Sequence, residues 1–532
     1  MIFAVDPRPI RLPLEHALSE LRTRRFSEAL WGRRLDAWTS DPQVQKKIAM
    51  RLGWLDAPSI MRPHVPRLQT LAAAVKADGF MDVVLLGMGG SSLAPEVIRA
   101  VIGVAPGFPR FHVLDSIDPD EIRLTIRRPE TTLFIVASKS GSTIEVSSLA
   151  AEAERLVRES GVVSTSSHFI AITDEGSPLH QQALNRKFRD LFLNPADIGG
   201  RYSALSFFGL VPAALMGVDI TALLASADAM AALSRNDDPQ QNPAVMLGAA
   251  MAAGALAGRD KLTLRLPATL EPLALWVEQL VAESTGKNGK GIVPVLAPRD
   301  DSSGQDRLDV SVDSVHDAAL GGAFFQWEIA TAAAGFLLGI NPFDEPNVQQ
   351  AKDATRALLA GFQSDGQLPI PTPHASFDGV DVTFSAAARE RMRHGGPAEF
   401  ASLLQPGDYC GLLAYLPSRD ARFAEVLYQA QSAVTARSGC VTTIGYGPRY
   451  LHSTGQLHKG GPNTGLFIVV TTPSDSDRPI PGESYSFGIL EQAQGLGDFQ
   501  SLDRERRRAA YVHLPKRDPS LLSATFRRFF GD

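Results

Sequence analysis

A run of hydroxyl side chains around one lysine, at residues 138–143, is the clearest chemical feature of the sequence. This segment, SKSGST, follows the apolar stretch TTLFIVA, which is typical of a buried strand, and precedes IEVSSLAAEAERLV, which has helical spacing. The first turn of a helix has free N–H groups and the positive end of the helix dipole, so this junction could hold an oxyanion. The alternative is a solvated loop, because turns also favour polar residues.

The segment WVEQLVAESTGKNGKG, at residues 276–291, could supply acid–base chemistry. Gln279 and Glu283 are four residues apart and therefore share one face of the expected helix. Glu283 falls in the last turn, where the negative end of the helix dipole disfavours ionisation, so we expect a raised pKa. Such a carboxylate suits a general base that works near neutral pH. The alternative is an exposed Glu–Lys helix end.

Two glycine-rich segments could bring backbone groups and a guanidinium close to a ligand. LGMGGSSLAPE, at residues 86–96, has glycines where a strand turns into a helix, but not the G-x-G-x-x-G spacing of dinucleotide sites. IGGRYS places Arg201 between a flexible turn and an apolar helix, where its paired N–H groups could bind an oxyanion. The alternatives are a structural turn and a solvated arginine.

Two loops in the C-terminal half contain further candidates. NPFDEPNVQQAK leads into a helix that carries Lys352, and YLHSTGQLHKGGPN follows an apolar strand and contains His452, Gln456 and His458. No group of His, Asp and Glu residues has the spacing of a metal site, so we expect no catalytic metal.

Strands that alternate with helices must position these segments. From residue 80, short apolar runs such as MDVVLLGMG, RFHVLDS and SHFIAITD alternate with helical stretches, which is typical of a parallel sheet covered on both faces. Ligands of such sheets lie at the carboxyl ends of the strands, where GMGGSS and SKSGST fall. We expect KLTLRLP to open a second α/β unit whose further strands are YCGLLAYLP, CVTTIGYG, GLFIVVTT and AYVHLP. A helical block at about 315–362 separates KLTLRLP from YCGLLAYLP.

The length of 532 residues predicts two or three domains in an α/β fold. Residues 1–75 have helical spacing and form a helical N-terminal segment. We expect residues 76–238 to form a first doubly wound parallel-sheet domain, and residues 239–532 to form a second one with a helical insertion. The polar stretch RNDDPQQNP marks the boundary between them.

Composition excludes several classes of function. The net charge of −6 gives no support to binding of nucleic acid or of a membrane surface. No apolar run is long enough for a membrane span, and the N-terminal residues lack the pattern of a secretory signal. The only cysteines, Cys410 and Cys440, exclude a disulfide framework and suit a reducing compartment, so we expect a cytoplasmic location.

Taken together, five segments resemble those of the glucose-6-phosphate isomerase family, which has the sugar-isomerase (SIS) fold. They occur in the family's order over about residues 80–355, as GMGGSSLAP, SKSGSTIE, GGRYS, QLVAESTGKNGKG and NPFDEPNVQQAK. The resemblance implies two SIS-type domains, a homodimer and no cofactor. It also implies an aldose–ketose isomerase that interconverts glucose 6-phosphate and fructose 6-phosphate through a cis-enediol.

The resemblance implies that two loops bind the substrate. The hydroxyl-rich loop would hold the phosphate, with its lysine alongside, through Ser138, Lys139, Ser140 and Thr143. The glycine turn would line the sugar site through Gly90 and Ser91.

The resemblance also implies catalytic roles. Arg201 would stabilise the developing enediolate charge, and Glu283 would move the proton between C2 and C1. Gln279 and Lys352 would contact the sugar hydroxyls, and Lys352 would help to open the ring.

Two features depart from the family pattern. Glu345 stands where the family commonly has Gln, and Asn347 replaces a glycine. The ring-opening histidine of the family lies between its Glu and Lys segments, whereas here the corresponding phrase LHSTGQ comes about 100 residues after Lys352. This displaced order, together with LDAWTSDPQVQKKIAMRLGWL, resembles the isomerase half of fused transaldolase–isomerase proteins. His452 is therefore the candidate for ring opening, and His316 is the competitor unless it is only a polar helix start.

Two alternative functions stay open. A dual-specificity isomerase would also accept mannose 6-phosphate, which a coupled assay with both substrates tests. A non-catalytic SIS-fold sensor would bind a sugar phosphate without converting it. Glu283 discriminates the sensor from either enzyme, because a sensor has no need of a base on that helix; fold analogy alone would not settle function.

Overall fold

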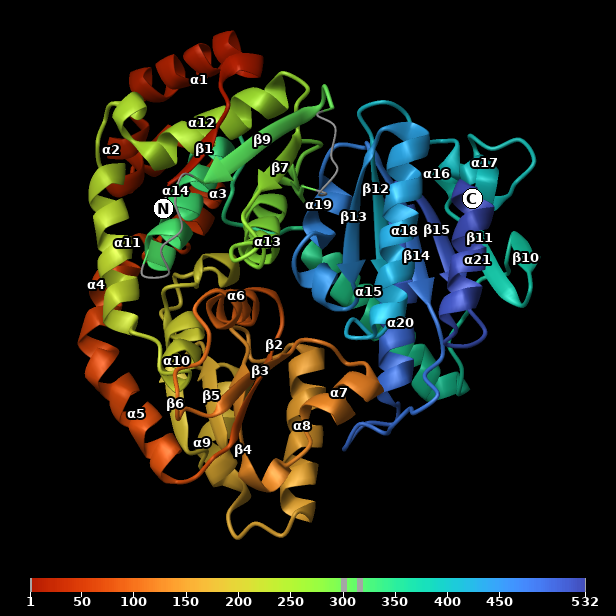
Figure 1. The fold of residues 1–532 in the computed structure, drawn as a ribbon, viewed down its shortest axis with the longest axis horizontal. Coiled ribbons are helices and arrows are strands. Elements are labelled where there is room, and N and C mark those ends of the chain that lie inside the picture. The colour runs from red at the N-terminus through yellow and green to blue at the C-terminus, as the bar shows by residue number, and fades with distance from the viewer. Residues whose placement is uncertain (1, 298–303, 313–318, 532) are drawn as a thin grey trace. The chain divides into compact units, whose positions relative to one another are not determined.

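The computed structural model describes residues 2–297, 304–312 and 319–531, which form two compact units (Figure 1). Unit 1 contains residues 1–115, 125–285 and 291–344, and unit 2 contains residues 116–124, 286–290 and 345–532. The predicted domain bounds, 1–75, 76–238 and 239–532, do not coincide with these units, because the chain passes between the units more than once.

The first sheet of unit 1 has five parallel strands in the order β3-β2-β4-β5-β6. Their bounds are β2 Asp82–Gly87, β3 Arg110–Leu114, β4 Thr132–Ala137, β5 Phe169–Thr173 and β6 Asp190–Leu193. This is a doubly wound order, in which the direction of winding reverses between β2 and β4. Both of these strands are buried along their whole length, as their continuous apolar runs predicted.

Helices follow the strands of this sheet, as the alternating pattern predicted (Figure 1). They are α6 Leu93–Val101 after β2, α8 Ile144–Glu159 after β4 and α9 Pro178–Arg186 after β5. Helix α8 packs against β2 and β4, and α9 packs against β5. The predicted doubly wound parallel sheet and the helices that follow its strands are confirmed.

A second sheet of unit 1 has the order β1-β9-β7-β8. Its bounds are β1 Phe3–Val5, β7 Lys261–Arg265, β8 Val293–Leu296 and β9 Arg307–Val312. Strand β7 is KLTLRLP, so the prediction that this strand would join the later strands is wrong. Leu262 and Leu264 of β7 belong to the same hydrophobic core as Val83 and Leu85 of β2. The pattern identified a buried strand correctly, but the sheet it joins depends on packing.

The remaining elements of unit 1 are helices. The N-terminal ones, as expected from residues 1–75, are α1 Arg11–Thr23, α2 Phe26–Trp31, α3 Pro42–Ala49, α4 Ala57–Met61 and α5 Val65–Ala77. The others are α10 Phe207–Leu215, α11 Ile220–Ser234, α12 Pro243–Leu256, α13 Leu273–Thr285 and α14 Leu320–Leu338. Helix α14 is buried on nearly all sides and packs against α11, α12 and α13.

Unit 2 is built around a six-stranded sheet in the order β10-β11-β15-β14-β12-β13. The four predicted strands, β12 Tyr409–Ala414, β13 Val441–Tyr446, β14 Gly465–Thr471 and β15 Arg508–His513, are parallel, and β10 Ala375–Phe377 and β11 Val380–Phe384 add an antiparallel edge. The winding reverses between β12 and β14, so the predicted second doubly wound sheet is confirmed except for β7, which lies in another sheet. Its helices are α15 Val348–Asp365, α16 Ala386–Arg389, α17 Pro397–Ala401, α18 Ala421–Ser438, α19 Gly455–Gly460, α20 Phe487–Arg504 and α21 Pro519–Phe530.

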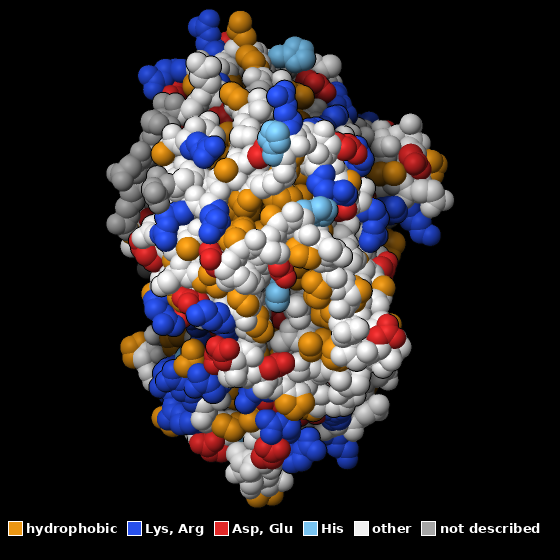
Figure 2. All heavy atoms as spheres, turned by 90° about the vertical axis from the view of Figure 1, so that its right-hand side faces the viewer, with side chains coloured by type: hydrophobic (Ala, Val, Ile, Leu, Met, Phe, Trp, Pro, Cys, Tyr) orange, Lys and Arg blue, Asp and Glu red, His pale blue; other side chains and the backbone are white. Residues whose placement is uncertain are grey.

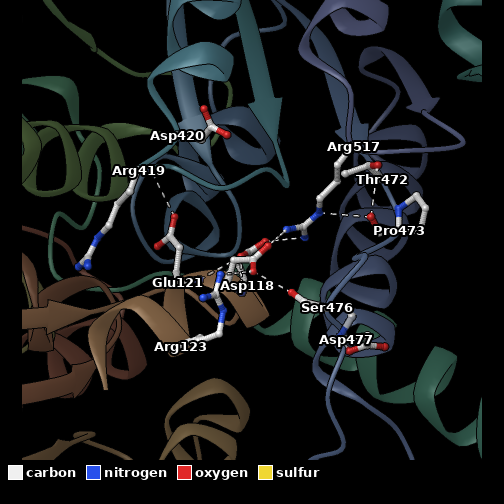
Figure 3. A network of polar contacts seen from close by, with 12 residues as sticks. Asp118, Glu121, Arg123, Arg419, Asp420, Thr472, Pro473, Ser476, Asp477 and Arg517 are labelled. Atoms are coloured by element: carbon white, nitrogen blue, oxygen red, sulfur yellow. Dashed lines mark hydrogen bonds and ion pairs between the residues drawn. The ribbon is translucent and has the colours of Figure 1, made fainter. Parts of the chain in front are cut away.

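Residues 116–124, which we call the strap, come from the first half of the sequence but pack in unit 2 and include most of α7 Pro119–Thr125. Arg517 forms an ion pair with Asp118 at 2.5 Å and with Asp120 at 3.3 Å (Figure 3). Glu121 accepts hydrogen bonds from the backbone N–H and the hydroxyl of Ser418 at 2.5 and 2.7 Å. Asp118 and Glu121 are buried, so these contacts compensate carboxylates that have been removed from water.

The surface carries side chains of both charges. On the face shown in Figure 2, basic and acidic side chains both reach the surface, with apolar side chains between them. In the described part of the chain, every helix is too short or too polar to cross a membrane.

Candidate active site

A glutamate and an arginine lie side by side in the interior of unit 1. Glu283 is in the last turn of α13, and Arg201 is in the short helical turn Gly200–Tyr202. The Nη1 atom of Arg201 lies 3.4 Å from Oε1 of Glu283, and the two side chains are only 3% and 10% exposed. The side-chain amide of Gln279 donates to Oε2 of Glu283 at 3.2 Å. Three residues predicted for the site are therefore in direct contact.

The guanidinium of Arg201 is fixed from three directions. Its Nε donates to the hydroxyl of Ser284 at 2.7 Å, and its Nη2 donates to the carbonyls of Pro342 and Asp344 at 2.7 and 3.0 Å. The hydroxyl of Tyr202 lies 3.4 Å from that of Ser284, and burial raises the pKa of Tyr202 well above its ordinary value. These bonds hold the positive charge at one place beside Glu283.

Ser284 contacts Arg201, and we did not single it out from the sequence. It is completely buried and directly follows Glu283 at the end of α13. The sequence did contain one signal for Ser284, because a polar residue directly follows the proposed base, Glu283. The sequence could not show that its partner is Arg201, because 83 positions separate the two residues.

The glycine turn after β2 lies against the turn that carries Arg201. A Cβ atom added to Gly90 would lie 2.1 Å from the carbonyl oxygen of Gly200, so the two backbones approach as closely as glycine allows. The hydroxyl of Ser203 donates to the carbonyl of Gly90 at 3.2 Å. Ser91 is buried beside it. The close packing therefore explains why residue 90 is a glycine. The role of Gly90 and Ser91 in binding a sugar stays a prediction.

The hydroxyl-rich loop connects β4 to α8. The hydroxyls of Ser138 and Thr143 lie 3.0 Å apart, and Ser138 also accepts the backbone N–H of Gly141 at 3.1 Å. Gly141 has a φ of +65°, a left-handed conformation that favours glycine at this turn. Thr143 is the N-cap residue of α8 and makes no side-chain capping bond, whereas Ser140 is exposed. The loop thus presents hydroxyls next to the first turn of a long helix.

Lys139 of this loop contacts residues that follow two other strands of the sheet. Its Nζ forms an ion pair with Asp174 at 2.5 Å and donates to the carbonyl of Ala196 at 2.8 Å. Burial raises the pKa of Asp174, and the charge of Lys139 opposes that rise. In the structure, Lys139 ties the loop to the segments that follow β5 and β6.

The glycine turn and the hydroxyl-rich loop leave the sheet beside each other. Strands β2 and β4 are hydrogen-bonded neighbours, and Gly87 at the end of β2 is paired with Ala137 at the end of β4. The winding reverses between these two strands, and ligands of open α/β sheets bind at such a point. The two segments are therefore where we expected them.

His452 and Lys352 belong to unit 2. His452 is half-buried at the end of the turn Arg449–His452, which follows the carboxyl end of β13 as predicted. Lys352 is half-buried on α15. The competing residue, His316, lies outside the described residues.

His458 is part of the core. It is 2% exposed and lies against the rings of Tyr409, Tyr450 and Phe467. Burial lowers its pKa well below the ordinary value. An enclosed imidazole of this kind is a packing residue, so His452 stays the candidate for ring opening in this segment.

Fold and site together define a class: doubly wound α/β proteins with a buried Glu–Arg pair and a hydroxyl-rich loop in unit 1. Residues 72–300 match the model of the phosphoglucose isomerase family. The match includes Glu283 and Arg201 and ends before Lys352 and His452. This part of the chain is similar to the phosphoglucose isomerase family.

Individual proteins show the same similarity. A glucose-6-phosphate isomerase of Rubrobacter xylanophilus is 28% identical over 62% of this chain and 94% of its own length. Those of a Cyanothece species and of Prochlorococcus marinus NATL2A are 34% and 39% identical, and the match spans only 48% and 41% of their lengths and 44% and 39% of this chain. The crystal structure of a glucose-6-phosphate isomerase from Chlamydia trachomatis matches with a TM-score of 0.52 and 19% identity, over 68% of this chain and 89% of that one, and shares its fold.

Proposed function

We propose that the protein interconverts glucose 6-phosphate and fructose 6-phosphate through a cis-enediol. The observation that carries this proposal is the buried pair of Glu283 and Arg201, whose charged atoms are 3.4 Å apart. In the open-chain sugar, the carboxylate takes the proton from C2 and returns it to C1. The fixed guanidinium stabilises the negative charge that develops on the enediolate oxygen. Proton transfer and charge stabilisation suffice, so the reaction needs no cofactor.

The phosphate of the substrate binds at the hydroxyl-rich loop in this proposal. The hydroxyls of Ser138, Ser140 and Thr143 donate to its oxygens, and the first turn of α8 adds free N–H groups and the positive end of a dipole. Lys139 adds positive charge nearby, although part of that charge is neutralised by Asp174. Gly90 and Ser91 line the sugar, and the amide of Gln279 contacts its hydroxyls.

Ring opening precedes proton transfer and needs a group that moves a proton between the ring oxygen and the C1 hydroxyl. An imidazole can both donate and accept a proton, and we assign this step to His452 with assistance from Lys352. The position of His452 after the carboxyl end of a parallel strand supports the assignment.

The resemblance to this family supports finer features of the proposal. We propose a cytoplasmic homodimer, because the resemblance implies a dimer and two cysteines suit a reducing compartment. Neither a dual-specificity isomerase nor a sensor is favoured by a particular observation. The Glu283–Arg201 pair supports an enzyme, because a sensor would not need a base opposite a guanidinium.

A coupled assay with fructose 6-phosphate as substrate tests the proposal. We expect conversion to glucose 6-phosphate without any added cofactor or metal ion, and no conversion of mannose 6-phosphate. Binding of both hexose phosphates by calorimetry without conversion would identify a sensor. Conversion of mannose 6-phosphate at a comparable kcat/KM would identify a dual-specificity enzyme.

A further inference from the structure

One buried carboxylate holds both ends of the loop that carries His452. Asp498, on α20, accepts a hydrogen bond from the Tyr450 hydroxyl at 2.7 Å and forms an ion pair with Lys459 at 2.5 Å. Tyr450 precedes His452 by two residues, and Lys459 follows it by seven. The side chain of Asp498 has no exposed surface, and that of Lys459 is 2% exposed. Asp498 therefore binds both ends of segment 450–459, which includes most of α19.

The surroundings of Tyr450 keep its hydroxyl protonated, so that it can donate a hydrogen bond to Asp498. Burial, followed by the charge of Asp498, raises the pKa of Tyr450 well above its ordinary value, so the hydroxyl stays protonated. A buried carboxylate is costly unless it is paired and hydrogen-bonded, and Asp498 has one partner of each kind. The hydroxyl of Tyr450 also lies 3.3 Å from that of Tyr415. Each contact restricts where the backbone next to His452 can lie.

The same loop is fixed in its middle and at its end. The buried amide of Gln456 donates to the carbonyl of Gly286 at 2.9 Å and to the side chain of Asn347 at 2.8 Å, and accepts the backbone N–H of Asn347 at 2.8 Å. Arg507 donates to the carbonyls of Lys459 and Gly461. His452 is thus a half-buried side chain on a backbone held at several points.

We propose that Asp498, through Tyr450 and Lys459, is a positioning residue for the imidazole that opens the sugar ring. This inference rests on the proposed function, because it takes His452 as the ring-opening group. Proton transfer needs donor and acceptor within hydrogen-bonding distance, and a displacement of about 1 Å can cost about a hundredfold in rate. A clamp on the backbone at both ends of the loop prevents such a displacement.

Tyr450→Phe tests the clamp, because it removes the hydroxyl and keeps the ring. Two rates are measured on the full chain: turnover of closed-ring glucose 6-phosphate, and deuterium exchange at C2 of an open-chain substrate analogue. We expect turnover to fall about tenfold and exchange to change less than about twofold, since exchange does not need ring opening. Asp498→Asn should show the same selective pattern as Tyr450→Phe, with a larger loss of closed-ring turnover.

Tyr511→Phe is the matched control. Tyr511 is also a buried tyrosine of the unit 2 sheet, and its hydroxyl accepts a hydrogen bond from Thr471 at 2.9 Å. Its loss should leave the ratio of the two rates unchanged. Since Asp498→Asn leaves Lys459 buried without its partner and could fail to fold, Tyr450→Phe is the deciding variant, with its fold checked by circular dichroism.

His452→Ala separates the inference from the function on which it rests. If His452→Ala slows closed-ring turnover selectively while Tyr450→Phe slows both rates equally or neither, Asp498 is not a positioning residue. If His452→Ala leaves closed-ring turnover normal, His452 does not open the ring, and the inference falls with that assignment. A selective defect in both His452→Ala and Tyr450→Phe supports the clamp.

Discussion

The Nη1 atom of Arg201 lies 3.4 Å from Oε1 of Glu283, and both side chains are almost completely buried. Charges in such a setting interact more strongly than in water, because the effective dielectric constant is lower. Removing one partner leaves the other as an uncompensated charge. Variants of this pair must therefore be assessed by both rate and stability.

Glu283→Gln keeps the size of the side chain and removes the proposed base. We expect turnover to fall by about 10²–10⁴-fold or more, while calorimetry shows largely retained binding of the sugar phosphate. Glu271→Gln, two residues before α13, is a control that should keep normal turnover. Near-normal turnover in Glu283→Gln would mean that another group is the base.

Ser284→Ala removes the acceptor of the Arg201 Nε–H. A buried donor without a partner costs about 1–3 kcal/mol, so the free energy of unfolding, measured in urea, should fall by that amount. Turnover should fall about tenfold as well, because the guanidinium loses one of the bonds that orient it. Ser284→Thr keeps the hydroxyl and should recover most of the rate. A stability loss with unchanged kcat would give Ser284 a purely structural role.

Replacing Ser138 and Thr143 together by Ala removes two hydroxyls of the proposed phosphate site. Each lost hydrogen bond to a charged group should cost about 1.5–3 kcal/mol of binding free energy, for sugar phosphates and inorganic phosphate alike. Calorimetry with both ligands measures this. Ser147→Ala, which removes a hydroxyl bonded to the carbonyl of Ile144 on α8, should have no effect. Unchanged phosphate affinity in the double variant would place the phosphate elsewhere.

Gly90→Ala places a Cβ atom 2.1 Å from the carbonyl oxygen of Gly200, a contact that the backbone must relieve by moving. We expect a loss of about 1–3 kcal/mol in the free energy of unfolding and a lower kcat, because Arg201 follows Gly200 directly. Gly361→Ala, on α15, meets no atom within 4 Å and should raise stability by about 0.5–1 kcal/mol. Equal stability in the two variants would contradict the close approach.

His452→Ala and His316→Ala distinguish the two candidates for ring opening. We expect His452→Ala to slow turnover of the closed-ring sugar far more than exchange of the C2 proton, and His316→Ala to change neither rate appreciably. Isomerisation rates and deuterium incorporation measure both. A ring-opening defect confined to His316→Ala would exchange the two roles.

Local patterns predicted much of the fold because each strand carries its own signal. The apolar runs at 132–137 and 465–471 form buried strands, and the polar loop after the first lies at the expected end of the sheet. The helical spacing that placed Gln279 near Glu283 is equally local. The pairing of β7 depends instead on which helices cover it, and the pattern of that strand contains no such information.

The partners of the site residues were not predictable from local patterns. Ser284 is bound by Arg201, Gly90 touches Gly200, and Asp498 holds Tyr450, in each case across a long stretch of sequence. Nothing around Asp498 distinguishes it from an ordinary polar residue on a helix. The roles assigned to the site residues themselves stay predictions until the variants are measured.

The strap has a consequence for how the protein is made. Asp120 and its partner Arg517 are 397 positions apart, so at about 5–20 residues per second the strap waits roughly 20–80 s during synthesis before that arginine exists. Until then Asp118 cannot take its buried place beside Arg517. Unit 2 can therefore reach its native form only after Arg517 has left the ribosome, and the strap must stay hydrated on the nascent chain until that moment.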